Sequence, residues 1–160
     1  MFLEWDHGVF IPMMLINPSA RIPIVQVSVL NSENAAELYK MGRALETLRN
    51  TNVAIIGSGA ASFHNLRLLF GGAAANPQFQ KRLHEWSDAV HEAVAQSDTE
   101  MRRRKLEGWR QITNTDVMHP KGAGEHFSPL VVIAGAGGQG RPERYVDELM
   151  GINMWTYYWN

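Results

Sequence analysis

The sequence contains no cysteine. This absence excludes disulfides and thiolate metal sites together, so a metal ion could bind only to histidine, aspartate or glutamate side chains. The sequence also lacks an excess of positive or negative charge, because 15 basic residues nearly balance 16 acidic ones and the formal net charge is -1 at pH 7. The chain therefore lacks the overall field that attracts nucleic acids or anionic membranes, and neither is expected as a partner.

Long apolar runs are absent as well. No uninterrupted run approaches the roughly 20 residues that cross a bilayer. The first residues also lack the basic region and apolar stretch of a signal peptide, so a cytoplasmic location is expected. With 160 residues and 45% hydrophobic content, the chain is long enough for one domain with a real core, and residues 1–160 are taken as that single domain.

Two segments rich in valine and isoleucine predict a βαβ unit. Residues 22–30 and 53–57 have the composition of strands, and between them leucine and methionine recur at helical spacing over 34–49. Strands joined in this way lie parallel, with a right-handed crossover. The expected fold is a three-layer α/β domain with a mostly parallel sheet. His64, shortly after the second strand, is expected at the sheet's carboxyl edge, where open sheets bind ligands.

Helix signals continue in the second half of the chain. An asparagine and a proline open the pattern of a helix over 76–96. Ser97 and Glu100 have the spacing of a capping box and start a further helix that ends near residue 111. The basic run 102–105 lies in this helix and is interpreted as a solvated face.

Three apolar segments are harder to assign. Residues 125–135 fit a buried strand or a helix equally well, because short apolar runs do not separate the two. Residues 1–16 favour a short buried helix. The tail, residues 152–160, alternates and carries aromatic residues, so it is predicted to form the last strand.

The run Gly-Ala-Gly-Gly-Gln-Gly at 135–140 matches the glycine spacing of a dinucleotide-binding turn. Pro142 follows directly, and too few residues remain for the rest of a βαβ unit and its ribose-binding acid. The segment is interpreted as a flexible loop. A nucleotide-binding module stays as an alternative that rests on these residues alone.

Six histidines are the candidate ligands and proton carriers. Four lie at element boundaries or in loops, where side chains can converge on a cleft: His7, His64, His119 and His126. Imidazole and carboxylate ligands with open positions suit a ferrous oxygenase. His84 and His91 lie inside the helix predicted over 76–96 and are interpreted as surface or packing residues.

Four motifs spread over nearly the whole chain occur together. They are Asp-His-Gly-Val-Phe-Ile-Pro at 6–12, Ile-Pro-Ile-Val-Gln-Val-Ser at 22–28, Gly-Ser-Gly at 57–59 with His-Asn-Leu at 64–66, and Glu-His-Phe at 125–127 before Pro-Leu at 129–130. In this order they resemble the class III extradiol ring-cleavage dioxygenases, and within them the DOPA-dioxygenase-like branch. The resemblance implies a non-haem ferrous iron, sometimes replaced by zinc, that binds a catechol and O₂ and supports ring opening beside the hydroxyl pair.

The resemblance also assigns roles to residues. It implies that His64 is the acid–base residue that takes a catechol proton, a task that suits a pKa near neutrality. It implies that His126 is a metal ligand and that His7 lines the substrate pocket, with Asp6 orienting His7. Two further residues of the same motifs are expected to contact the substrate: Ser58 and Asn65. The predicted function is oxidative ring opening of a DOPA-like catechol.

Members of this family carry a further N-terminal part, with a first strand and two histidines that complete the iron site. The sequence is therefore expected to be a C-terminal portion of the family fold, in which Glu125, His119 or Asp116 could complete the site. The alternative function is a catalytically inactive remnant that binds a metal or a partner chain. A missing leading strand would leave a sheet edge and an apolar face uncovered, which favours self-association into a homo-oligomer.

Overall fold

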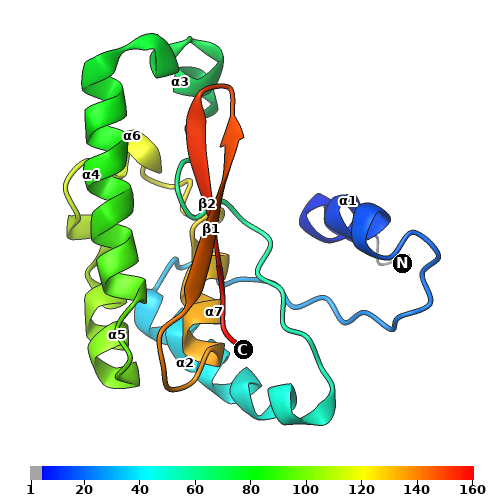
Figure 1. The fold of residues 1–160 in the computed structure, drawn as a ribbon. Coiled ribbons are helices and arrows are strands. Elements are labelled where there is room, and N and C mark those ends of the chain that lie inside the picture. The colour runs from blue at the N-terminus through cyan, green and yellow to red at the C-terminus, as the bar shows by residue number, and fades with distance from the viewer. Residues whose placement is uncertain (1–4) are drawn as a thin grey trace.

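The computed structural model describes residues 5–160, which form a mostly helical fold with one β-hairpin (Figure 1). The α-helices are α1 (His7–Ile16), α2 (Ala35–Leu45), α3 (Leu66–Phe70), α4 (Pro77–Val94), α5 (Thr99–Glu107), α6 (Thr115–Met118) and α7 (Ser128–Ala136). Short 3₁₀ helices are η1 (Glu46–Thr51), η2 (Ala73–Ala75) and η3 (Trp109–Gln111), and the strands are β1 (Glu143–Leu149) and β2 (Ile152–Tyr158). The two strands form the only sheet within residues 5–160, and it is antiparallel. The prediction of a three-layer, mostly parallel sheet is therefore wrong.

The two segments predicted as parallel strands, 22–30 and 53–57, pair with no strand of the described chain. Several of their apolar side chains face solvent, and Val25 is 87% and Ile56 59% exposed, although Val29 packs against the core. A strand needs a neighbour that bonds to its peptide groups, and β-branched composition cannot supply one. The predicted strands over 22–30 and 53–57, and the βαβ unit built from them, are therefore wrong for the described residues.

Local capping signals were better guides to the helices. Asn34 accepts from the backbone N–H of Ala36 and caps α2, and Asn76 caps α4, with proline in its first turn. The predicted helices over 34–49 and 76–96 are confirmed, except that the first tightens into η1. The helix predicted to start at the capping box of Ser97 and Glu100 is α5. It begins one residue later than expected, because Asp98 rather than Ser97 caps it.

The ambiguous segment 125–135 resolves as a helix, because α7 begins at Ser128. This helix packs on α2 at very short range. A methyl group added to Gly42 would lie 1.9 Å from the carbonyl oxygen of Val132, and one added to Gly135 would lie 2.3 Å from that of Tyr39. The two glycines therefore let the helix backbones touch, and larger residues would separate them.

The ends of the chain agree only in part with expectation. The tail forms β2 as predicted, and it pairs with β1 through a turn at Met150 and Gly151, both with positive φ, as tight hairpins require. The helix expected within 1–16 exists as α1, but none of its residues is buried, so the expectation of a buried helix is wrong. Residues 1–4 lie outside the described part. Figure 1 places α1 at the side of the molecule, away from the other helices. Within residues 5–160, no helix combines the length and the apolar character that crossing a bilayer demands.

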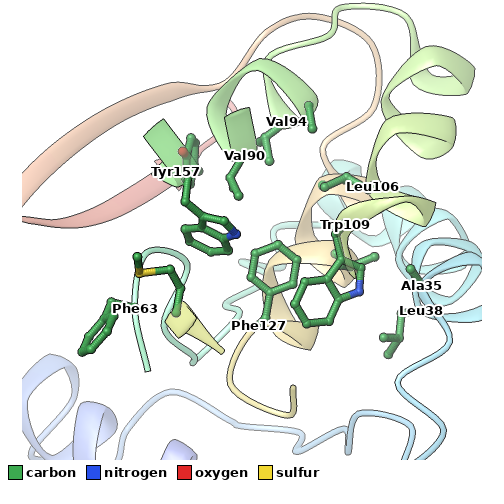
Figure 2. Close-up of a cluster of buried hydrophobic side chains, with 14 of the residues drawn as sticks. Ala35, Leu38, Phe63, Val90, Val94, Leu106, Trp109, Phe127 and Tyr157 are labelled. Atoms are coloured by element: carbon green, nitrogen blue, oxygen red, sulfur yellow. The ribbon is translucent and has the colours of Figure 1, made fainter. Parts of the chain in front are cut away.

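The core lies between α2, α4, α5, α7 and the hairpin, and Figure 2 shows its aromatic centre. Trp109 stacks on Phe127 with ring centroids 4.2 Å apart, and Trp86 meets the same phenylalanine at 5.8 Å. Phe127 is fully buried. Because Phe127 follows His126 directly, burial of this ring anchors the histidine beside it.

Candidate active site

Two backbone hydrogen bonds bring the segment around His64 to the chain around His126. The N–H of Ala60 donates to the carbonyl oxygen of His126 at 2.7 Å, and the N–H of His64 donates to that of Met118 at 3.0 Å. A methyl group on Gly59 would lie 2.4 Å from the His126 carbonyl oxygen. The Gly-Ser-Gly motif therefore lets the backbone pass close enough to hold both histidines at one place.

The imidazoles of His64 and His126 stack, with ring centroids 3.4 Å apart and planes inclined by 24°. A carboxylate oxygen of Glu125 lies 3.3 Å from Nε2 of His126. Among the described residues, His64, Glu125 and His126 place one ligand atom each within 4.8 Å of one another. Two imidazoles and one carboxylate form a donor set that suits ferrous iron or zinc, so the residues present fit such an ion.

Burial lowers the pKa of His64 below its ordinary value of 6.5, and the neighbouring His126 lowers it further, while Glu125 acts in the opposite direction. His64 is therefore neutral at pH 7. A neutral imidazole can accept a proton from a substrate or donate a lone pair to a metal ion.

The Asp-His-Gly motif at residues 6–8 also lies near the His126 ring. The His7 ring lies 6.5 Å from the His126 ring, and Gly8 approaches the hydroxyl of Ser58. Asp6 lies 3.5 Å from Nδ1 of His7, but its closer contact is with the N–H of Gly8 at 2.8 Å, where it caps α1. Of the sequence-predicted site residues, the structure therefore places His64 and His7 beside the His126 ring, and Asp6 and Ser58 next to the His7–Gly8 segment. The side chains of Asp6 and His7 are mostly exposed.

Asn65 is engaged in the scaffold beside the cluster. Its amide nitrogen donates to the carbonyl oxygen of Val117 at 2.9 Å, and its oxygen accepts from the N–H of Leu68 and caps α3. These contacts hold the start of α3 against α6 directly after His64. The predicted contact of Asn65 with a substrate stays a prediction.

Of the three residues considered as completing ligands, Glu125 alone belongs to the cluster. His119 is fully buried among the rings of Trp86, Trp109 and Phe127, and both of its ring nitrogens lack a hydrogen-bond partner. Burial lowers the pKa of His119 to about 3, with smaller effects from His64, Arg110 and His126. Asp116 lies 3.4 Å from the Lys121 ammonium and faces Arg110 at 3.9 Å.

A cavity of about 450 Å³ opens beside the cluster. His126 and Leu130 form one wall, residues of segment 53–61 a second, and the end of β2 with Trp159 a third, so two tryptophans and two tyrosines belong to the lining. The aromatic side chains of this lining suit an aromatic molecule. Sequence patterns indicated β2 as a strand but gave no sign that it faces His126, because that contact joins distant parts of the chain.

The glycine run 135–140 does not form a dinucleotide-binding turn. It begins in the last turn of helix α7 rather than after a strand, and two arginines donate hydrogen bonds to its carbonyl groups. Arg102 donates to Ala134, Gly138 and Gly140, while Arg49 donates to Gly137 at 2.8 Å. The segment is therefore bound to the body of the protein rather than free to wrap a phosphate.

The same contacts correct one further interpretation. Arg102 is fully buried, so the basic run 102–105 is not a solvated face throughout, although Arg104 is exposed. The interpretation of two other histidines is confirmed, since His84 is exposed and His91 stacks on Tyr157 at 5.9 Å.

The cluster supplies the donor set of a candidate non-haem metal site, and a cavity with aromatic residues in its lining lies beside it. Comparison with known proteins identifies the class of protein. Residues 2–156 match the family described as the catalytic LigB subunit of aromatic ring-opening dioxygenase. The chain belongs to this family, as the four sequence motifs indicated.

Curated relatives agree with the family assignment. The chain is 46% identical to the dioxygenase tasH of Hapsidospora irregularis, over 97% of this chain and 49% of that protein. It is 31% identical to a 4,5-DOPA dioxygenase extradiol of Beta vulgaris, over 84% of this chain and 47% of that protein. It is 28% identical to a 4,5-DOPA dioxygenase extradiol of Escherichia coli, over 82% of this chain and 46% of that protein. The chain thus spans about half the length of the curated relatives it matches.

Proposed function

We propose that this chain carries the acid–base and metal-binding residues of an iron-dependent extradiol dioxygenase that opens the ring of a catechol. The observation that carries the proposal is the cluster of His64, Glu125 and His126 in a member of a ring-opening family. Relatives named as 4,5-DOPA dioxygenases favour a DOPA-like catechol as the substrate.

His126 and Glu125 are the residues proposed to hold the iron, with zinc as an ion of similar ligand preference. Their two ligand atoms lie on adjacent residues, and α7 and the buried Phe127 fix them from the C-terminal side. When bound, ferrous iron supplies the position at which a catechol and O₂ meet and exchange electrons.

His64 is proposed as the acid–base residue. Its imidazole is neutral at pH 7 and stacks on His126, so a free ring nitrogen can take the proton of a catechol hydroxyl beside the metal ligands. The cavity beside His126 would hold the aromatic ring, and its apolar wall would exclude water from the reacting face. His7 is proposed to contact the substrate from beside His126, since the two rings lie 6.5 Å apart, and Ser58 to do so from the segment that Gly8 approaches.

The test is anaerobic loading with ferrous iron, followed by O₂ and a panel of catechols. A coloured ring-opened product is expected, and no product with any catechol would contradict the proposal for this chain. His64→Ala should abolish product while leaving the iron content intact, and His126→Ala should lower the iron content. Equal loss of iron in both variants would instead make His64 a ligand. His84→Ala, on the exposed face of α4, is the matched histidine control and should change neither value.

A second candidate is a protein that binds a metal or a partner chain without turnover. The observations that favour it are the exposed apolar side chains of segments 22–30 and 53–57 and the match to half of each relative's length. Stoichiometric iron binding combined with no product from any catechol would support this candidate over the enzyme.

A further inference from the structure

An ion pair outside the cluster closes the loop that leads to the metal-binding residues. A carboxylate oxygen of Glu33 lies 2.6 Å from a guanidinium nitrogen of Arg110, and each side chain is 24% exposed. The two residues come from distant parts of the chain, since Glu33 precedes α2 and Arg110 lies in η3. The pair is therefore a long-range link rather than a contact within one helix.

Each partner of this pair also holds one end of loop 119–124. Arg110 donates through its other terminal nitrogen to the carbonyl oxygen of His119 at 2.7 Å. Glu33 accepts from the N–H of Gly124 at 2.8 Å. Since Glu125 and His126 follow Gly124 directly, the pair fixes the point at which the chain enters the cluster.

Three further observations indicate that the Glu33–Arg110 pair is held in a fixed geometry. The Arg110 guanidinium lies 4.0 Å over the Trp109 ring, which limits its motion. Glu33 adopts a left-handed backbone conformation with φ of 51°, which non-glycine side chains avoid unless their contacts hold them there. A methyl group on Gly124 would lie 2.4 Å from the Glu33 carboxylate and 2.6 Å from the Arg110 guanidinium, so the pair fills the space that glycine leaves.

We propose that the Glu33–Arg110 pair is a positioning device for the metal centre: by closing loop 119–124 it sets the placement of Glu125 and His126 and thereby the affinity of the site for a divalent ion. This inference rests on the proposed function for its metal, although the positioning itself does not. Residues that orient metal ligands through a second layer of contacts typically change metal affinity by about 10- to 100-fold when they are removed.

Binding of Co²⁺ to the purified chain tests the proposal, because Co²⁺ reports affinity by titration against a chelator and ligand geometry by its visible spectrum. Glu33→Ala removes both contacts of the carboxylate, whereas Gly124→Ala keeps both side chains and wedges them apart. Both variants are expected to weaken Co²⁺ binding about tenfold or more and to alter the spectrum. Glu33→Gln, which can still accept from the Gly124 N–H, should show a smaller loss.

Two matched controls separate positioning from general loss of stability. Glu46→Ala removes the partner of Arg43 from a more exposed pair within one stretch of chain, with side chains 31% and 42% exposed. Gly108→Ala adds a methyl group that would meet a side chain only at the end of Gln111. Both should keep wild-type affinity and spectrum. If either Glu33→Ala or Gly124→Ala also keeps wild-type values of both, the inference is overturned.

A second measurement decides the case in which the wild-type chain binds no Co²⁺ and the proposed metal function fails. NMR of the metal-free protein records the amide of Gly124 and the imidazole signals of His64 and His126. Glu33→Ala should speed hydrogen exchange at Gly124 and shift the His126 ring signals. Unchanged signals would overturn the positioning role, whereas shifted signals would uphold it without a metal.

Discussion

The rings of His64 and His126 lie face to face with centroids 3.4 Å apart, although the two residues come from opposite halves of the chain. Burial lowers the pKa of His64, and the nearby His126 ring lowers it further, so the His64 ring favours its neutral form. Neutral rings are the forms that bind metal ions and accept protons. The arrangement therefore keeps the cluster ready for either role.

His119 should make the protein sensitive to acid. Its pKa is about 3 in the folded protein and 6.5 is the ordinary value, so the unfolded chain binds more protons between these two values. The free energy of unfolding should therefore be largest above pH 6.5 and fall below it, by at most about 1.4 kcal/mol per pH unit from this residue. Urea unfolding of wild type and His119→Leu at pH 7.5 and pH 5 measures this difference. An equal pH dependence in both proteins would show that His119 does not control it.

Arg102 should be essential for stability. Its guanidinium is fully buried and donates to the carbonyl oxygens of Gln96, Ala134 and Gly138, each of which would lose its partner. Arg102→Met keeps most of the side-chain volume and should lower the free energy of unfolding by about 3 kcal/mol or more. The exposed Arg104→Met is the control and should change it by less than about 0.5 kcal/mol. Similar values for the two variants would refute this assignment.

Gly42 should tolerate no side chain. A methyl group there would overlap the carbonyl oxygen of Val132 at 1.9 Å and force α2 away from α7. Gly42→Ala is expected to cost about 3 kcal/mol of unfolding free energy, even though alanine is the better helix former. Thermal unfolding against Gly108→Ala, which meets no backbone of another element, gives the comparison. A stabilised Gly42→Ala protein would contradict the close packing of the two helices.

A substitution in the cavity beside His126 should affect catechol binding without affecting metal binding. Leu130 lines this cavity and is only partly buried, so Leu130→Trp would fill the space without touching Glu125. The variant is expected to lose catechol binding, measured by titration calorimetry, while its Co²⁺ affinity stays at the wild-type value. Retained catechol binding would place the substrate elsewhere.

Local signals in the sequence predicted the helices well, because a helix cap and an apolar helix face each depend on residues that are close in the sequence. Asn34 and Asn76 each start a helix where expected. Strand pairing is decided by residues far apart, so segment 22–30 has the composition of a strand without forming one, and the sheet prediction failed. Burial of Arg102 has the same cause, since two of its acceptors, Ala134 and Gly138, lie more than 30 positions away in the sequence.

Some residues of the candidate site could likewise be predicted from the sequence, and others could not. His64 and His126 were found because they stand in motifs that resemble a family, and the structure stacks them. The roles given to them remain proposals. Glu33 and Arg110 carry no sequence signal, because they are separated by 77 positions and belong to no motif. Their contact became visible only once the chain was folded.

The contact between α2 and α7 also has a kinetic consequence. The two helices lie far apart in the sequence, yet their backbones come close at Gly42 and Gly135. Such a contact closes a long loop, and proteins rich in distant contacts fold slowly. During synthesis, the face of α2 that carries Gly42 therefore has no packing partner until α7 has left the ribosome.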